Sequence, residues 1–251
     1  MRLKEHSHVL TLVLIVLGTI AVIAAIQALT PPEEPNLALE ALRVKFAKDD
    51  PAGVDHSQFP ILNQKFESAQ EVTATCLTCH EERHDEVVNS SHFNWDRISY
   101  IDGRGIQALG KKNVLNNYCI SVAGNEAACA KCHTGYGMTN SKIYDFTDAN
   151  NVDCLACHAD TEEYAKGGGH GGDPLATVDL TKVAQTVGKP TIENCGSCHF
   201  LGGGGNNVKH GDLETALYSA DREMDVHLAN DGIDMTCVDC HTAENHQIAG
   251  K

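Results

Sequence analysis

Three features predict the fold class: five copies of Cys-x-x-Cys-His, a shortage of large aliphatic side chains, and one long apolar segment near the N-terminus. Together they predict a multihaem cytochrome c, in which mainly short α-helices and loops wrap around five haems with little β structure. The apolar segment adds one N-terminal transmembrane helix. We divide the chain into a membrane anchor or uncleaved signal at 1–30, a linker and lead-in at 31–55, and a pentahaem domain at 56–251.

The repeated motif places two thiols and an imidazole on one short loop. The thiols, three positions apart, form thioethers to the vinyl groups of one porphyrin, and the histidine lies under the iron as its proximal ligand. A zinc site would need cysteine pairs to combine into sets of four ligands, and zinc gives no reason for a histidine after each second cysteine. We therefore predict five haem c groups with these attachment cysteines and proximal ligands: Cys76, Cys79 and His80; Cys129, Cys132 and His133; Cys154, Cys157 and His158; Cys195, Cys198 and His199; Cys237, Cys240 and His241.

The composition of the chain after residue 30 would ordinarily indicate disorder. It has 17 Lys and Arg against 33 Asp and Glu, and only 43 of its 221 residues are Val, Ile, Leu or Phe. Few branched or aromatic residues combined with high net charge are typical of chains that cannot bury a core. Five porphyrins would supply the missing apolar surface, so we expect a domain that does not fold without haem.

Ten of the 11 cysteines belong to the motifs and only Cys119 is left over, so the cysteines are not a disulfide framework. The acidic charge argues against nucleic acid as a partner. It either favours basic redox proteins as partners or serves to keep the domain soluble.

The segment from Val9 to Leu29 is 21 residues without a charge. As a helix it spans about 31 Å, which matches a bilayer core of roughly 30 Å. It exceeds the apolar stretch of a cleavable signal, which favours an anchor. Arg2 and Lys4 precede it, so the positive-inside rule places the haem domain in the periplasm or outside the cell. The stretch Pro31–Pro35 is predicted to form a stiff acidic spacer.

The second axial ligand of each iron decides whether a haem relays electrons or binds substrate. Seven histidines lie outside the motifs and beyond the anchor. His84 follows His80 by four residues and so lies on the same side of that haem, which makes it a surface histidine. His170 lies in a glycine-rich loop. The better candidates for distal ligands are the remaining five: His56, His92, His210, His227 and His246.

Longer strings around the motifs carry a resemblance. Residues 110–120 (GKKNVLNNYCI), 152–158 (VDCLACH), 182–214 and 225–241 (DVHLANDGIDMTCVDCH) are similar to the octahaem tetrathionate reductase family of multihaem cytochromes c. The resemblance runs from about His56 to about Gly250. It implies a periplasmic cytochrome whose haems are bis-histidine except the second, which carries a distal lysine and forms a site for reducing tetrathionate, nitrite or hydroxylamine.

Carried onto this chain, the resemblance implies that the lysine of the second haem comes from GKKN, as Lys111 or Lys112. A lysine must lose its proton to bind iron, which costs roughly 4.6 kcal/mol at pH 7, so substrate would displace it more readily than histidine. The alternative is that both lysines are solvated surface charges.

The chain also departs from that family, because it has five motifs where the family has eight and it carries an anchor. We expect that a histidine serving an absent haem, His56 or His246, has no local iron and could serve a neighbouring chain. Three functions stay open: an anchored electron carrier fed by a quinol-oxidising module or another redox protein, a reductase of small nitrogen or sulfur substrates, and a protomer of a haem filament. Helices are expected at 81–89 and at 213–218, the latter with an extension to His227.

Overall fold

The computed structural model describes residues 2–30, 36–46, 53–113, 122–200, 205–208 and 211–248. Cys119, His210 and the spacer Pro31–Pro35 lie outside the described residues. The chain divides into two compact units, Met1–Lys48 and Asp49–Lys251, and each is described by itself.

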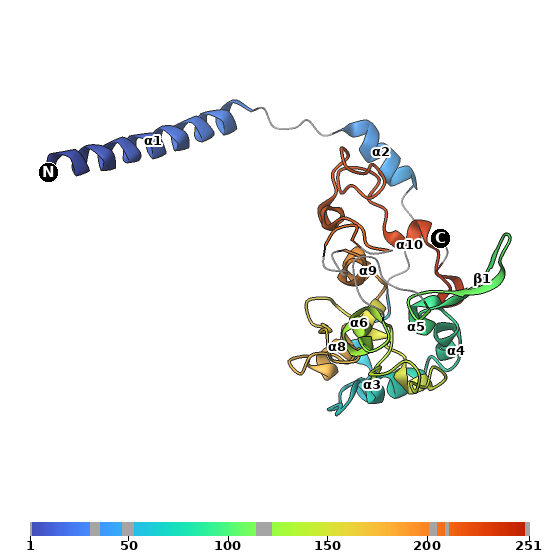
Figure 1. The fold of residues 1–251 in the computed structure, drawn as a ribbon. Coiled ribbons are helices and arrows are strands. Elements are labelled where there is room, and N and C mark those ends of the chain that lie inside the picture. The colour runs from blue at the N-terminus through green and yellow to red at the C-terminus, as the bar shows by residue number, and fades with distance from the viewer. Residues whose placement is uncertain are drawn as a thin grey trace. The chain divides into compact units, whose positions relative to one another are not determined.

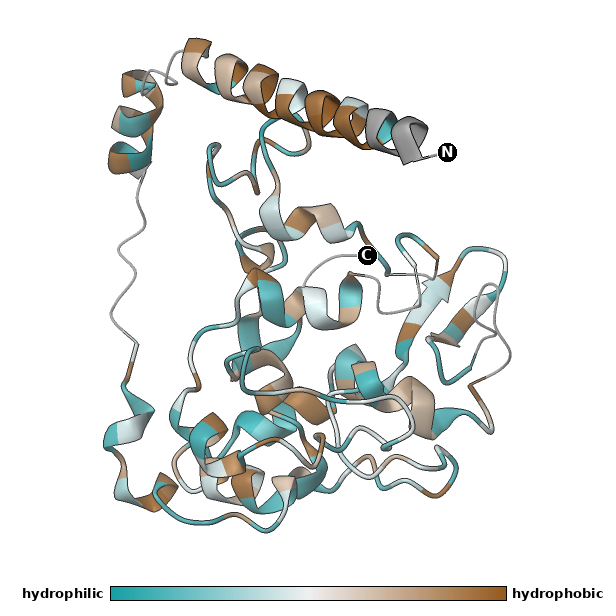
Figure 2. Ribbon diagram, turned by 90° about the vertical axis from the view of Figure 1, so that its left-hand side faces the viewer, coloured by the Kyte–Doolittle hydropathy of each residue, from teal (hydrophilic) through white to brown (hydrophobic). Residues whose placement is uncertain are grey.

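The N-terminal unit consists of α1 (Arg2–Leu29) and α2 (Leu37–Phe46). Within α1, residues His8–Leu29 have a mean hydropathy of 3.0 and none of that window is buried, so the helix is long and apolar enough to cross a membrane. Figure 2 shows hydrophobic colouring along most of its length.

Helix α2 lies inside the range 31–55 that the sequence assigned to a linker and lead-in. Its first turn is capped by Asn36, whose side-chain oxygen accepts a hydrogen bond of 3.1 Å from the backbone N–H of Leu39. The helix itself is rich in Leu and Ala, which favour helix formation. A capped run of helix-forming residues therefore lies within the predicted linker and lead-in.

The larger unit consists of short helices joined by turns, with one pair of strands (Figure 1). Its elements in chain order are η1 His56–Gln58, η2 Pro60–Leu62, α3 Ala69–Leu77, α4 Arg83–Val88, α5 Ser91–Asn94, β1 Arg97–Ile101, β2 Gly105–Leu109, α6 Glu126–Cys129, η3 Ala130–Cys132, η4 Ala149–Asn151, α7 Leu155–His158, α8 Leu180–Gln185, α9 Ile192–His199, η5 Thr215–Ser219, α10 Cys237–Cys240 and η6 Glu244–His246. This agrees with the predicted fold class of short helices and loops with little β structure.

The helix predicted at 81–89 is present as α4, whereas the one predicted at 213–218 is the 3₁₀ helix η5 and does not extend to His227. Asp221 and Asp225 explain the difference. The carboxylate of Asp221 accepts hydrogen bonds from the backbone of Glu223 and Met224, and that of Asp225 does the same for His227 and Leu228. Such local side-chain bonds give the backbone an alternative to helical pairing.

Strands β1 and β2 form an antiparallel hairpin in which Ile98 pairs with Ala108 and Tyr100 with Ile106. These residues share one face because side chains alternate along a strand. Ile98, Tyr100 and Ile106 are exposed on 71, 74 and 73% of their surface. The hairpin projects from the rest of the unit (Figure 1), and these exposed side chains form an apolar face on it.

Two small hydrophobic clusters lie in the larger unit instead of one extended core. One packs η2 and α3 against α7 and α8, and the other surrounds the second motif. Their buried members are Leu62, Phe66, Val72, Leu155, Ala159, Tyr164, Val183 and Ala184 in the first, and Trp95, Val122, Ala130 and Met138 in the second.

Candidate haem-binding sites

Each Cys-x-x-Cys-His motif lies on or at the end of a short helix. The fourth motif occupies α9, which begins with a reciprocal cap: Thr191 Oγ1 accepts from Asn194 N–H, and Asn194 Oδ1 accepts from Thr191 N–H at 2.8 Å. The fifth motif on α10 is capped in the same way by Thr236 and Asp239. All ten motif cysteines are free thiols in the structure, so each is available for thioether formation.

The third and fourth motif histidines are oriented through their Nδ1 atoms. His158 Nδ1 lies 2.8 Å from the carbonyl oxygen of Gly188, and His199 Nδ1 lies 2.7 Å from that of Gly211. A metal-binding histidine typically donates its other ring N–H to such an acceptor, which fixes the ring and leaves Nε2 for the metal. Burial lowers the pKa of His158, which favours the neutral form that binds metal.

Three motif histidines each face one histidine from outside the motifs. The ring centroids are 6.4 Å apart for His80 and His56, 6.3 Å for His158 and His246, and 6.2 Å for His199 and His92. Two imidazoles bound at about 2.0 Å on opposite sides of one metal ion have centroids about 6.3 Å apart. At these three motifs the residues therefore fit a six-coordinate haem iron.

His92 also connects two motifs. Its carbonyl oxygen accepts a hydrogen bond of 3.3 Å from Thr134 N–H, directly after the second motif, while its ring faces the histidine of the fourth. Burial is the main cause that lowers the pKa of His92, and the neighbouring His199 lowers it further.

The second motif is arranged differently. The Nε2 atom of His133 is hydrogen-bonded to the carbonyl oxygen of Phe93, and its buried Nδ1 has no hydrogen-bond partner among the residues that the structure describes. The rings of Phe93, Trp95 and Tyr144 pack within 5.0 to 5.6 Å of its centroid. Burial lowers the pKa of His133 to about 4. In this arrangement the second motif, unlike the third and fourth, does not present a free Nε2, so the imidazole of His133 would have to leave the Phe93 carbonyl before it could bind a haem iron.

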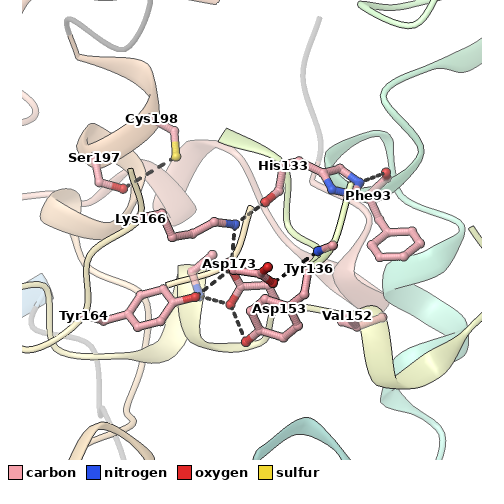
Figure 3. A network of polar contacts seen from close by, with 12 residues as sticks. Phe93, His133, Tyr136, Val152, Asp153, Tyr164, Lys166, Asp173, Ser197 and Cys198 are labelled. Carbon is pink, nitrogen blue, oxygen red and sulfur yellow. Dashed lines mark hydrogen bonds and ion pairs between the residues drawn. The ribbon is translucent and has the colours of Figure 1, made fainter. Parts of the chain in front are cut away.

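A buried polar network joins the second and third motifs (Figure 3). The carboxylate of Asp153 accepts hydrogen bonds from Tyr136 Oη at 2.9 Å, Tyr164 Oη at 2.9 Å, Lys166 Nζ at 2.7 Å and Ala156 N–H at 2.9 Å. These four donors occupy the acceptor capacity of a carboxylate. Lys166 Nζ also donates to the carbonyl oxygen of His133, and the lysine and aspartate side chains are only 6 and 0% exposed.

Both lysines predicted at the second haem lie near the second motif. Lys112 Nζ is 3.4 Å from the carboxylate of Asp96 and 4.2 Å from the centroid of the Phe146 ring, which itself packs on His133. Lys111 is close enough to Cys132 for its charge to lower the pKa of that thiol, although burial and a hydrogen bond outweigh it. Neither contact is with an imidazole nitrogen, and iron ligation by either lysine stays a prediction.

Two other predicted residues lie apart from the three ring pairs. His227 is exposed beside Asp225, with 3.6 Å between its Nδ1 and the carboxylate. His241 of the fifth motif is exposed. His84 bonds to the carbonyl oxygen of Glu81 and lies 3.2 Å from Asp85, as expected for a surface histidine.

The sequence did not single out Asp153, Lys166 or Glu86. Glu86 accepts from His246 Nδ1 at 2.7 Å across 160 positions of sequence, a separation at which no local pattern could reveal the contact. The sequence shows that Asp153 directly precedes Cys154 of the third motif. Its three side-chain donors lie 11 to 17 residues away, so no local pattern indicated the network.

The attachment loops lie close together in a defined order. Thr73 on α3 donates to the carbonyl oxygen of Val152 at 2.6 Å, which links the first motif to the third. Helices α7 and α9 pack together and link the third motif to the fourth. The Cys132 thiol lies 3.9 Å from the Cys198 carbonyl oxygen, and the Cys237 thiol lies close enough to Cys195 to raise the pKa of the Cys195 thiol, so the second and fifth motifs both adjoin the fourth.

Comparison with known proteins gives two matches. The solved structure of an octaheme cytochrome c from Shewanella oneidensis aligns with a TM-score of 0.71 and 42% identity over 79% of this chain and 43% of that one. An uncharacterized protein of Archaeoglobus fulgidus is 25% identical over 246 residues, covering 78% of this chain and 80% of that protein. No protein-family model matches.

The short-helix architecture, the motifs and this likeness define the class: the chain has the fold of a multihaem cytochrome c. The particular protein that it resembles is the Shewanella oneidensis octaheme cytochrome c, of which it spans less than half the length. That neighbour agrees with the predicted resemblance at the level of an octahaem cytochrome. The narrower likeness to tetrathionate reductases stays a prediction.

Proposed function

We propose that this protein is a membrane-anchored electron-transfer cytochrome that carries five covalently bound haem c groups. The observation that carries the proposal is the set of three histidine pairs at 6.2 to 6.4 Å, each joining a motif histidine to one outside the motifs. A haem iron with two histidine ligands has no open position for substrate, and it supplies one-electron exchange at low potential.

The proposal assigns distal ligands from these pairs. His56 serves the first haem, His246 the third and His92 the fourth. The sequence predicted both as distal candidates and left open that one of them, His56 or His246, has no local iron; their positions opposite His80 and His158 support local irons for both. His210 and His227 remain the candidates for the fifth haem.

The adjacency of the attachment loops supports a branched route for electrons. The first, third, fourth and fifth motifs follow one another, and the second adjoins the fourth. On this route the donor is a quinol-oxidising module or a redox protein, and the acceptor is outside the membrane. Helix α1 supports an anchored location with the haem unit in the periplasm or outside the cell.

Haem stoichiometry and spin state test the proposal. Intact mass and pyridine haemochrome absorbance of the mature protein should give five haems for each chain. Electron paramagnetic resonance should show at least three low-spin bis-histidine centres. A mature chain with fewer covalent haems, or with high-spin iron at the first, third and fourth sites, would contradict it.

The distinct surroundings of His133 favour a second candidate function. Among the rings that pack on His133 in the described residues, none is a histidine, while Lys111 and Lys112 lie nearby. A second haem without two histidines would support a reductase of nitrite, hydroxylamine or tetrathionate. Turnover of these substrates by the mature protein, lost in a Lys111→Ala, Lys112→Ala variant, would favour this reading; turnover that survives would remove its predicted site.

A further inference from the structure

The three histidine pairs differ in what holds the second ring nitrogen. His158 and His199 face backbone carbonyl oxygens through Nδ1, and so does His56, 3.1 Å from the carbonyl of Val54. His246 instead places Nδ1 2.7 Å from the carboxylate of Glu86. Among these four, His246 alone has a charged acceptor.

The contact between His246 and Glu86 is supported by neighbours on both sides. Glu86 lies on α4 with its side chain 19% exposed, and its other carboxylate oxygen is 2.6 Å from Arg83. On the opposite side, Gln247 donates to the backbone oxygen of Glu86 at 2.8 Å.

The backbone at His246 carries strain that its contacts must offset. Asn245 and His246 both have positive φ, 52° and 55°, a region that non-glycine residues seldom adopt. Residues held in sparsely populated conformations cluster at functional sites, where the surrounding structure fixes them. The two contacts to Glu86 are what fixes this turn against α4.

We propose that Glu86 is a positioning residue for the third haem, which orients His246 and strengthens it as a ligand so that this haem has a lower reduction potential. A carboxylate that accepts the Nδ1 proton raises the basicity of a metal-bound imidazole. A more basic ligand stabilises the oxidised iron more than the reduced iron. The inference rests on the proposed function, because it requires His246 to be the distal ligand of the third haem.

Redox titration of the mature, full-length protein tests this inference. Glu86→Gln keeps a hydrogen-bond acceptor and removes the charge. We expect the reduction potential of one haem to rise. At a fixed applied potential its ratio of reduced to oxidised form should increase about tenfold, which corresponds to about 59 mV for one electron. The matched control is Glu82→Gln, which removes the same charge from an exposed position beside α4 and should leave all couples unchanged.

Two further variants separate the possible failures. His246→Ala should create one high-spin haem; if none appears, His246 is not a ligand and the pairing in the proposed function fails. If the high-spin haem appears but Glu86→Gln titrates like the parent or like Glu82→Gln, the histidine pairing stands and only the proposed role of Glu86 is overturned. If Glu86→Gln fails to mature, Arg83→Gln tests the same inference. This variant leaves Glu86 in place without its neighbouring cation and should lower the reduction potential of the same haem. An unchanged or raised potential would contradict the inference.

Discussion

At the scale of single residues, surface histidines differ from candidate iron ligands in which groups lie next to their rings. His84 and His92 are eight positions apart and both lie on short helices, yet they have different partners. His84 contacts the carbonyl oxygen of Glu81, before its helix, and the exposed Asp85, while the ring of His92 lies 6.2 Å from that of His199. Residue type alone could not distinguish them. The folded positions of the neighbouring elements decide the difference.

This difference makes a direct comparison possible. His92→Ala should convert one low-spin haem into a high-spin centre, because the iron opposite His199 loses its second ligand. Electron paramagnetic resonance and magnetic circular dichroism of the mature protein measure the change. His84→Ala is the control and should match the parent, and equal spectra for the two variants would contradict the assigned pair.

The Asp153 network is the clearest case of a buried charge whose partners are all present. The aspartate is fully buried and its lysine nearly so, and two tyrosine hydroxyls complete the set. Removing one member of a buried ion pair leaves the other charge uncompensated, which costs far more than losing an exposed pair.

We therefore expect Asp153→Asn to lower the free energy of unfolding by about 3 to 5 kcal/mol, because it leaves Lys166 buried without its counter-charge. Urea unfolding of the mature protein, followed by circular dichroism, measures the effect. Glu163→Gln breaks an exposed pair with Lys182 in the same segment and should cost at most about 1 kcal/mol. Equal losses for both variants would show that the network does not behave as a buried pair.

At the scale of elements, the motif helices are too short to be stable by themselves. Helix α9 has eight residues and α7 and α10 have four each, whereas isolated helices need roughly 12 to 15 residues. Caps and close packing compensate. Gly196 on α9 is one such place, because a Cβ there would lie 2.5 Å from the ring of Tyr218.

The cap of α9 yields a prediction for the fourth motif. Thr191→Ala removes the hydroxyl that accepts from Asn194 N–H and should cost about 1 kcal/mol of stability. Chemical denaturation of the mature protein gives the value. Thr191→Ser keeps the hydroxyl and should lie close to the parent; a loss as large as that of the alanine variant would mean that the methyl group, not the cap, matters.

Elements were predictable where the signal was local. The run 81–89 gave α4, and the uncharged segment Val9–Leu29 gave most of α1. Helix α2 lies in the range predicted as linker and lead-in, and the aspartates after η5 favour turns where the sequence predicted an extension of the helix to His227. The three ring pairs could not be predicted, because they join residues 24 to 107 positions apart in the chain. The sequence supplied the candidate histidines and left their partners open.

At the scale of the whole molecule, the protein part alone supplies little apolar interior. The larger unit has two small clusters of buried side chains, in keeping with the low aliphatic content of the sequence. A chain with few buried apolar groups and a large net charge does not offset the entropy lost on folding. The porphyrins would supply the remaining buried surface.

The chain made without haem attachment should therefore stay unfolded. Expression in a cytoplasm that lacks the attachment machinery should give a polypeptide with the far-ultraviolet circular dichroism and the hydrodynamic radius of a disordered chain. The exported, haem-loaded protein is the control. A compact apoprotein with a cooperative thermal transition would contradict this expectation.

The anchor gives a second prediction at this scale. Full-length protein should remain with membranes after an alkaline carbonate wash, because α1 is apolar over a length that spans the bilayer. Residues 49–251 exported behind a cleavable signal should be released as soluble protein. Release of the full-length chain by the same wash would show that α1 is removed or lies outside the bilayer.

The turn that carries His246 has a consequence for biogenesis. It reaches back to α4, which is synthesised 160 residues earlier. If His246 is the distal ligand, the third iron acquires its full coordination only when residue 246 has crossed the membrane, 88 positions after His158. Ribosome stalling or a nonsense codon shortly before this turn would then yield an exported cytochrome with every attachment cysteine in place and one iron still five-coordinate.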